Sequence, residues 1–159
     1  NIELIAPTIT LLLQWADEKD TNKKFRAIQG LGEVGVARPG WAYQAIEKLF
    51  KIVESDENAQ GRYKAFTEIS RIAKKEMSMV VEYVPSVITA LKDSDKQIRR
   101  LAAWTLGQMA EVIPLEAKEA IPALTEALHD EYPLVRTFAD KALNLIRKAM
   151  REEKTEDQQ

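Results

Sequence analysis

Apolar residues recur along most of the chain at intervals of three and four, the spacing of an amphipathic helix. In the segment 21–36, Ala27, Ile28, Leu31 and Val34 fall on one helical face. Short polar or proline-containing stretches interrupt this pattern. It therefore predicts an all-α protein built from pairs of helices. The expected repeats cover about residues 2–36, 39–75, 77–111 and 114–151, followed by a polar C-terminal tail over residues 152–159.

Breaker and capping residues set the expected helix boundaries. The stretch from Ala37 to Gly40 contains a proline and a glycine, so we expect a new helix to begin near Trp41. Ser94 and Gln97 have the spacing of a capping box at the start of another helix. Pro133 is expected in the first turn of the last helix, where the missing amide costs nothing.

One stretch of the chain is repeated. The residues from Val84 to Ala110 recur 37 positions later, from Ile121 to Arg147. Three aspartates and three arginines repeat at this spacing of 37 residues: Asp56, Asp93 and Asp130, and Arg62, Arg99 and Arg136. Each aspartate precedes its arginine by six residues, and Glu18 and Lys24 keep that gap in the first repeat. A self-similar unit of two helices and a turn is the signature of a stacked repeat protein.

The repeated unit resembles the HEAT repeat, and most closely the HEAT-like repeats of the phycobilin lyase group. It has a proline in its first helix, an aspartate in its turn, and then an aliphatic residue, arginine and alanine in its second helix. Repeat two departs from this pattern at Gly61, where an aliphatic residue is expected, and repeat one has Lys24 in place of arginine. The resemblance implies a right-handed α-solenoid (a superhelix) of about four HEAT-like hairpins. It also implies that the Asp and Arg series form a structural ladder of hydrogen bonds linking successive turns.

Helical periodicity separates a core side from an outer side on the second helix of each hairpin. In repeat three the expected core residues are Ile98, Ala102, Thr105, Leu106 and Met109. The opposite side carries Arg100, Trp104, Gly107 and Glu111 in repeat three, Tyr63, Thr67, Ser70 and Lys74 in repeat two, and Thr137, Lys141, Asn144 and Lys148 in repeat four. Because the second helices of solenoids line the concave surface, we expect these positions to form a continuous strip.

An aromatic and basic patch on this strip is the candidate partner-binding site. It comprises Tyr63, Arg71, Arg100, Trp104 and Lys141. An indole directed away from the core often has a partner, and this patch suits an acidic peptide, a helix or a stacked ring. The alternative is structural: Trp104 lies across the neighbouring helix, over the stems of Arg100 and Lys141.

Phe138 and Leu145 lie further round the last helix, on the side where another repeat would stack. Three interpretations stay open for them. They form an imperfect cap, a homodimer surface, or the seam to a further repeat.

The amino-acid composition argues against several functional classes of protein. The 159 residues carry a net charge of −2, with 45% hydrophobic and 30% charged residues and no cysteine. The charge favours neither nucleic acid nor an anionic membrane, and disulfide and thiolate chemistry are excluded. No apolar run reaches the ~20 residues that span a bilayer. The opening segment lacks the features of a signal peptide, and we expect a cytoplasmic protein. The start at Asn1 rather than Met suggests a trimmed chain or an excised domain.

Catalytic chemistry finds little support. The single histidine, His129, is expected at the end of a helix, where a cation meets the negative helix terminus. One histidine without cysteine does not make a zinc site, and no nucleophile with a general base is evident. Gly30, Gly32 and Gly35 lie in a helical pattern and do not form a phosphate-binding loop. We therefore expect no enzyme, no cofactor and no metal.

The sequence thus predicts a non-enzymatic scaffold that binds another protein or peptide on its concave face. A chromophore-handling accessory protein similar to bilin lyases is one alternative, implied by the resemblance alone. A nucleic-acid-binding HEAT-like protein, related in architecture to the alkylpurine DNA glycosylases, is another. The acidic balance and small size argue against nucleic acid.

Overall fold

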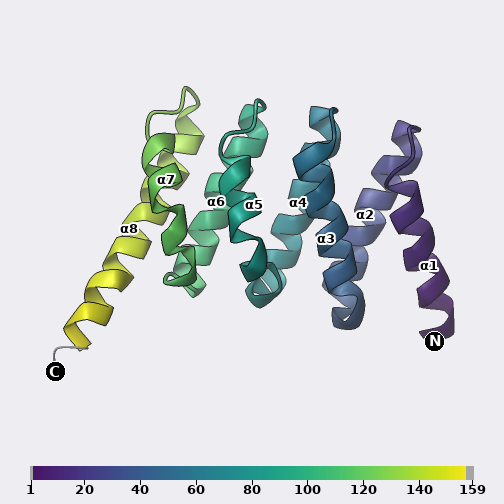
Figure 1. Cartoon of the computed structure of the whole chain (residues 1–159), viewed down its shortest axis with the longest axis horizontal. Helices are drawn as coiled ribbons and strands as arrows, with labels where there is room; N and C mark the ends of the chain where they lie inside the picture. Colours follow the sequence, from purple (N-terminus) through teal and green to yellow (C-terminus); the bar gives the residue numbers. More distant parts are fainter. Residues whose placement is uncertain (1, 157–159) are drawn as a thin grey trace. The chain divides into compact units, whose positions relative to one another are not determined.

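The computed structural model describes the backbone of residues 2–156, and the side chains of these residues apart from 2–7, 39 and 156 (Figure 1). Over this range the chain is helical and contains no strand, so the all-α prediction is confirmed. The α-helices are α1 (Ile2–Trp15), α2 (Thr21–Ala37), α3 (Pro39–Ser55), α4 (Ala59–Lys75), α5 (Val84–Ala90), α6 (Lys96–Val112), α7 (Ile121–Ala127) and α8 (Pro133–Glu156). Two 3₁₀-helices, η1 (Met77–Tyr83) and η2 (Glu116–Ala120), precede α5 and α7.

The chain divides into two compact units, residues 1–80 and residues 81–159. The first unit contains the hairpins α1–α2 and α3–α4, and the second contains α5–α6 and α7–α8. Each hairpin consists of a first helix, which we call the A helix, and a second helix, which we call the B helix.

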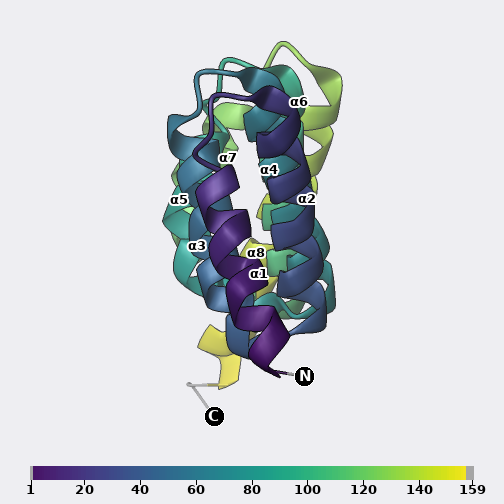
Figure 2. The same cartoon turned by 90° about the vertical axis from the view of Figure 1, so that its right-hand side faces the viewer.

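In the first unit the helices form two layers. The B helices α2 and α4 pack against each other, and the A helix α3 packs on both of them. Figure 2 shows α1 and α3 on one side of this unit and α2 and α4 on the other. Aromatic side chains fill the space between α3 and α4, where the rings of Phe50 and Phe66 meet edge to face with centroids 6.5 Å apart.

In the second unit the A helices are short because proline starts them late. Pro85 and Pro122 lie in the first turns of α5 and α7, where a proline removes no helical hydrogen bond. The segments before them run as η1 and η2. The B helices α6 and α8 pack closely against each other, and small buried side chains such as Ala102 and Ala139 allow this approach.

Most helix boundaries follow the sequence prediction, and three differ. Helix α3 begins at Pro39 rather than near Trp41, because proline is suited to the first helical position. The N-cap of α6 is Asp95, whose carboxylate accepts the amide of Gln97 at 2.7 Å, so the capping box predicted at Ser94 is wrong. The expected polar tail is helical as far as Glu156, and residues 157–159 lie outside the described range.

The turn of each of the last three hairpins is closed by its own arginine. Nη1 of Arg62, Arg99 and Arg136 donates to the main-chain carbonyl six residues earlier, at 2.9, 2.9 and 2.7 Å. The carboxylate of the residue at that earlier position accepts the amide two residues further on, at 3.0, 2.8 and 2.8 Å. The six-residue spacing in the sequence therefore reflects a turn that both side chains of the pair hold closed.

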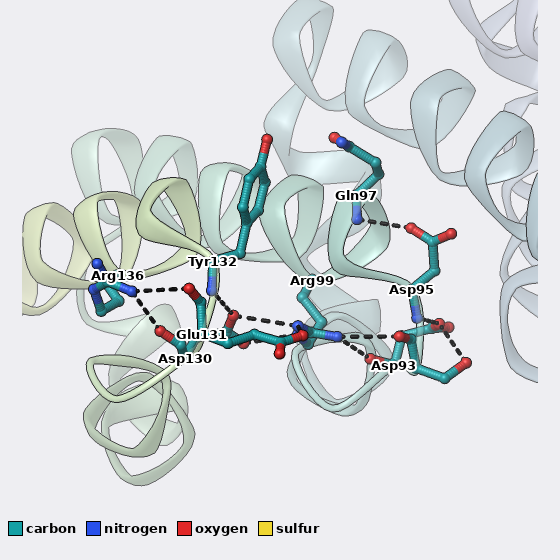
Figure 3. Close-up of polar contacts among 9 residues, drawn as sticks. Asp93, Asp95, Gln97, Arg99, Asp130, Glu131, Tyr132 and Arg136 are labelled. Carbon is teal, nitrogen blue, oxygen red and sulfur yellow. Dashed lines mark hydrogen bonds and ion pairs between the residues drawn. The ribbon is translucent and has the colours of Figure 1, made fainter.

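A cationic side chain of the B helix also binds the turn of the next hairpin. Nε and Nη2 of Arg99 donate to the two carboxylate oxygens of Asp130 at 2.7 and 3.2 Å, and Nη2 also contacts Glu131 (Figure 3). In the first unit, Lys24 Nζ donates to Asp56 Oδ2 at 3.1 Å. Each of these contacts joins the B helix of one hairpin to the turn of the following one.

Electrostatics in the Arg99–Asp130 pair favour the charged forms. Burial raises the pKa of Asp130, but hydrogen bonds from Arg99 and from the Tyr132 amide outweigh it, and the pKa falls below its usual value. The hydrogen bonds that Arg99 donates to Asp130 raise the pKa of Arg99, with burial opposing this effect. Only 12% of the Arg99 side chain and 10% of the Asp130 side chain are exposed, so solvent screens the pair weakly.

The glycine in repeat two has a local explanation. The position of a Cβ atom on Gly61 is occupied by the Asp56 carboxylate, which is held there by the Asn58 amide and by Lys24. An aliphatic side chain at this position would displace that carboxylate.

Candidate protein-interaction site

The two sides of helix α6 follow the predicted division. All five expected core residues are buried, including the hydroxyl-bearing Thr105. On the outer side, Ser70 and Gly107 depart from the prediction because both are buried. The Ser70 hydroxyl donates to the Phe66 carbonyl at 2.9 Å, which satisfies it inside its own helix. Gly107 has no side chain, and a Cβ atom there would meet nothing within 4 Å.

A groove of about 320 Å³ runs between the B helices α2 and α4 of the first unit. Every residue that lines it comes from these two helices: Phe25, Arg26, Ile28 and Gln29 from α2, and Tyr63, Lys64, Thr67 and Glu68 from α4. The predicted site residue Tyr63 therefore lies in the wall of a concave feature.

Two aromatic side chains give the groove its apolar surface. Phe25 and Tyr63 are both half-buried. Lys64 Nζ lies 5.0 Å from the centroid of the Phe25 ring, a cation–π contact. The Tyr63 hydroxyl makes no hydrogen bond to any residue that the structure describes, so it can bond to a partner.

The acidic group in the groove is Glu68. Its carboxylate lies over Gly32 of α2, at the place where any side chain on Gly32 would extend. Only 16% of the Glu68 side chain is exposed. Burial raises the pKa of Glu68, and the opposing attraction of Arg71 does not cancel this effect.

Glu68 is paired with Arg71 of its own helix. Arg71 Nη2 lies 2.6 Å from Glu68 Oε2, which makes an ion pair. Oε2 is buried, so this ion pair with Arg71 is shielded from water on the Glu68 side.

The predicted site residue Arg71 thus lies beside the groove and already forms an ion pair with Glu68. Two site residues of the second unit also have partners. Lys141 Nζ lies 2.5 Å from Glu111 Oε1, and Arg100 Nε donates to Gln97 Oε1 at 2.9 Å. Arg71 and Lys141 are therefore each paired with a carboxylate of their own unit, whereas Arg100 is bound to a neutral amide and keeps its positive charge.

Trp104, on α6 of the second unit, is half-buried and not enclosed in the core. Its indole N–H has no hydrogen-bond acceptor among residues 2–156 as far as they are described. Trp104 is therefore a half-exposed aromatic side chain with an available donor.

Phe25 and Glu68 were missed by the sequence analysis, although a signal for Phe25 was present. It lies five residues after the N-cap Asp20, just as Tyr63 lies five residues after the N-cap Asn58. The shift of one residue in the first repeat hid this equivalence. Nothing in the sequence pattern distinguished Glu68 from an exposed glutamate.

The described residues contain no group of three or more His, Cys, Asp or Glu side chains arranged to hold a metal ion. His129 follows the C-terminal end of α7 and is exposed, and its amide donates to the Glu126 carbonyl. Among the helices described, none combines the length and hydrophobicity that crossing a lipid bilayer requires.

Comparison with solved structures defines the class of protein as an all-α solenoid of repeated helical hairpins. An engineered protein matches 91% of this chain with a TM-score of 0.69 and 18% identity. A designed armadillo repeat protein in complex with the peptide (KR)4 matches 90% of it with a TM-score of 0.70 and 18% identity. The chain spans 64% and 66% of the length of these two proteins.

The family within this class follows from the sequence comparison. The family model for HEAT repeats matches residues 46–144, and the chain belongs to the HEAT repeat family. The phycobilin lyase subgroup is not confirmed. A third solved structure, from work on a phosphorylation switch in the interaction between cadherin and beta-catenin, covers 85% of this chain and 28% of its own, with a TM-score of 0.67 and 18% identity. No curated protein sequence matches the chain.

Proposed function

We propose that this chain is a non-enzymatic protein-interaction module that binds a peptide or helix of a partner protein on the outer face of its B helices. The observation that carries the proposal is the groove between α2 and α4, which combines aromatic walls with charged groups of both signs. Small concave sites with a few converging polar groups are typical of recognition surfaces.

The composition of the groove supports a peptide. Phe25 and Tyr63 offer apolar area at low conformational-entropy cost, as aromatic anchors in interfaces do. Arg26, Lys64 and Glu68 place both signs of charge around them. An amphipathic segment that carries an apolar side chain and charged groups would contact both the aromatic and the charged parts of the groove.

Trp104 extends the proposal to the second unit. Its half-exposed ring and unpaired indole N–H are the features that aromatic residues show when they contact a partner. The designed armadillo neighbour, which shares only the fold at 18% identity, is itself in complex with a peptide. This supports a peptide as the kind of ligand.

Selection of peptides on the full chain tests the proposal. A phage-displayed random peptide library is selected on the immobilised protein, and the recovered peptides are measured by fluorescence polarisation. Tyr63→Ala and Trp104→Ala are each compared with wild type. We expect Tyr63→Ala to weaken groove-binding peptides at least about tenfold, which corresponds to ~1.4 kcal/mol.

Tyr43→Ala is the matched control. Tyr43 is the most comparable exposed tyrosine, 56% exposed on the A helix α3 of the same unit. The Tyr43→Ala substitution removes a tyrosine side chain from the opposite layer and should leave the peptide affinity unchanged. Peptides that bind Tyr63→Ala and Trp104→Ala as tightly as wild type would contradict the proposal, as would peptides that lose affinity only in Tyr43→Ala.

The two alternative functions give different results. A chromophore-handling protein would change the absorbance spectrum of a bilin in a titration. A nucleic-acid-binding protein would bind DNA with an affinity that falls steeply as salt is raised. Both alternatives, and the cytoplasmic location, stay predictions.

A further inference from the structure

Two cations in the groove between α2 and α4 have no carboxylate partner among the described residues. Arg26, on α2, is exposed, and its side chain forms no hydrogen bond or ion pair within the described part of the chain. Asp20 attracts it electrostatically, but the Asp20 carboxylate accepts the amides of Asn22 and Lys23 at the start of α2. The positive charge of Arg26 is therefore available to a partner.

Lys64, on α4, is the second of these cations. Its Nζ lies 5.0 Å from the centroid of the Phe25 ring, and this contact holds the charge over the aromatic wall of the groove. An ammonium group that lies over a ring still has hydrogens to donate to a carboxylate. Lys64 thus places a positive charge in the groove from the helix opposite Arg26.

The acids near the groove are already bound. Glu68 forms the ion pair with Arg71 at 2.6 Å, and Glu33, on α2, accepts the side-chain amide of Gln29 at 3.4 Å. Glu33 and Lys64 both act electrostatically on the Glu68 carboxylate. With Arg71 included, three cations therefore meet two carboxylates here, although the whole chain carries a net charge of −2. A local excess of positive charge favours a negatively charged partner.

The hydroxyl groups of the groove add one more donor. The Thr67 hydroxyl donates to the Tyr63 carbonyl at 2.8 Å and is satisfied inside α4. The Tyr63 hydroxyl makes no such bond to a described residue. Tyr63, Arg26 and Lys64 thus bring three donor groups to one groove. Hydrogen bonds from charged donors to a carboxylate are stronger than those between neutral groups.

We propose that this groove binds an acidic segment of a partner protein. An apolar side chain of the segment packs against Phe25 and Tyr63, and its carboxylates accept hydrogen bonds from Arg26 and Lys64. The acidic character of the partner is an addition to the proposed function, on which it rests. Both helices belong to the first unit, so every group of the site lies within one compact body.

A nucleic acid strand is a poorer match for the groove. Its affinity depends on a cation for each of several phosphates. The groove offers two cations without a carboxylate partner and contains the Glu68 carboxylate, which repels phosphate. A short acidic segment needs no more than these two cations.

Two peptide libraries that differ only in charge test the proposal on the full chain. Both fix the same apolar positions, and the charged positions are Asp or Glu in one library and Lys or Arg in the other. Both are displayed on phage and selected on the immobilised protein, and the recovered peptides are measured by fluorescence polarisation. We expect binders from the acidic library, with an affinity that falls as salt is raised.

Charge reversal locates the contact. Arg26→Glu and Lys64→Glu should each weaken the acidic peptides at least about tenfold, or ~1.4 kcal/mol. Arg38→Glu is the matched control, because Arg38 is an exposed arginine that follows the last residue of α2 and lies outside the groove. It makes the same charge change and should leave the affinity unchanged. If Lys64→Glu does not fold, Arg26→Glu alone decides, because Arg26 is exposed and has no ion pair to lose.

Three results would overturn the proposal. Basic peptides that bind more tightly than acidic ones, and lose affinity in Tyr63→Ala, would leave the groove a peptide site but reverse the charge of its partner. Acidic peptides that bind Arg26→Glu as tightly as wild type would contact the chain elsewhere. A single-stranded oligonucleotide that displaces the acidic peptides, and is itself weakened by Arg26→Glu, would show that the groove binds nucleic acid.

Failure of the proposed function gives a different result. Either neither library then yields a binder, or the recovered peptides bind Tyr63→Ala and Trp104→Ala as tightly as wild type whatever their charge. In both cases the acidic partner is overturned together with the interaction module.

Discussion

Arg99 and Asp130 form a two-point contact between adjacent hairpins, with Nε and Nη2 of the arginine facing the two oxygens of the carboxylate. The third nitrogen, Nη1, is bound to carbonyls of the arginine's own turn at 2.9 and 3.2 Å. The Arg99 side chain thus binds both the turn of its own hairpin and the turn of the following hairpin. This arrangement makes Arg99 more than a surface ion pair, because both partners are largely shielded from water.

Arg99→Ala should lower the free energy of unfolding by about 1–3 kcal/mol, since a shielded carboxylate loses its partner and two turn carbonyls lose their donor. Thermal unfolding followed by circular dichroism measures the effect. Arg136→Ala is the comparison: it removes the same bonds to its own turn but no carboxylate contact with another described hairpin. Equal losses in the two variants would mean that the contact with Asp130 contributes nothing.

Asp130→Asn tests the charge of the same pair. The asparagine side chain can still accept the Tyr132 amide, so the turn is kept while the charge is removed. Because the pKa of Asp130 is lowered in the folded protein, its stabilisation is present above the unfolded pKa of about 3.9 and is lost as the pH falls through the lowered value. Wild type should be more stable than the variant at pH 7, and the difference should vanish in strong acid. A difference that persists at low pH would contradict the electrostatic explanation.

Glu68→Gln should change the stability of the protein in the opposite direction from Asp130→Asn. The folded protein raises the pKa of Glu68, so ionisation of this group destabilises the fold as the pH rises from about 4.3 towards the raised value. The variant should therefore be at least as stable as wild type at pH 7, and its advantage should shrink below about pH 4. Denaturant unfolding at several pH values measures this. A variant that is clearly less stable at pH 7 would show that the pair with Arg71 outweighs the burial of the charge.

Two glycine substitutions should act in opposite directions. Gly61→Ala should destabilise the protein, because the new Cβ meets the Asp56 carboxylate, which Lys24 holds. Gly107→Ala should stabilise it by up to about 1 kcal/mol, since the site is open and alanine favours the helix. Both lie within B helices, so the difference in unfolding free energy between them measures the close approach at Gly61. Similar effects in both would contradict it.

The repeat register was readable from the sequence because it depends on local chemistry. The period of 37 residues and the six-residue gap between Asp93 and Arg99 reflect one turn, whose bonds form within a few residues. The helix limits also follow local signals, as at Pro133, which begins α8 as expected. Where two signals competed, the sequence was ambiguous: Ser94 and Asp95 are both good capping residues, and the fold uses Asp95.

The candidate site was less predictable because it depends on contacts between helices. Helical periodicity located Tyr63 but gave no sign of Glu68, whose burial depends on the missing side chain of Gly32 on another helix. Periodicity likewise placed Arg71 and Lys141 on the outer side without showing that Glu68 and Glu111 neutralise them. Such pairings arise from packing between helices and from side-chain conformation, which a one-dimensional pattern does not contain.

The closure of each turn by its own arginine has a consequence for how such chains change in length during evolution. A turn that satisfies its carbonyls internally needs no particular neighbour in order to form. Duplicating or deleting one period would therefore preserve every surviving turn. We therefore expect gain or loss of a whole repeat to preserve the remaining turns, and an insertion within the six-residue gap to break the turn that it enters.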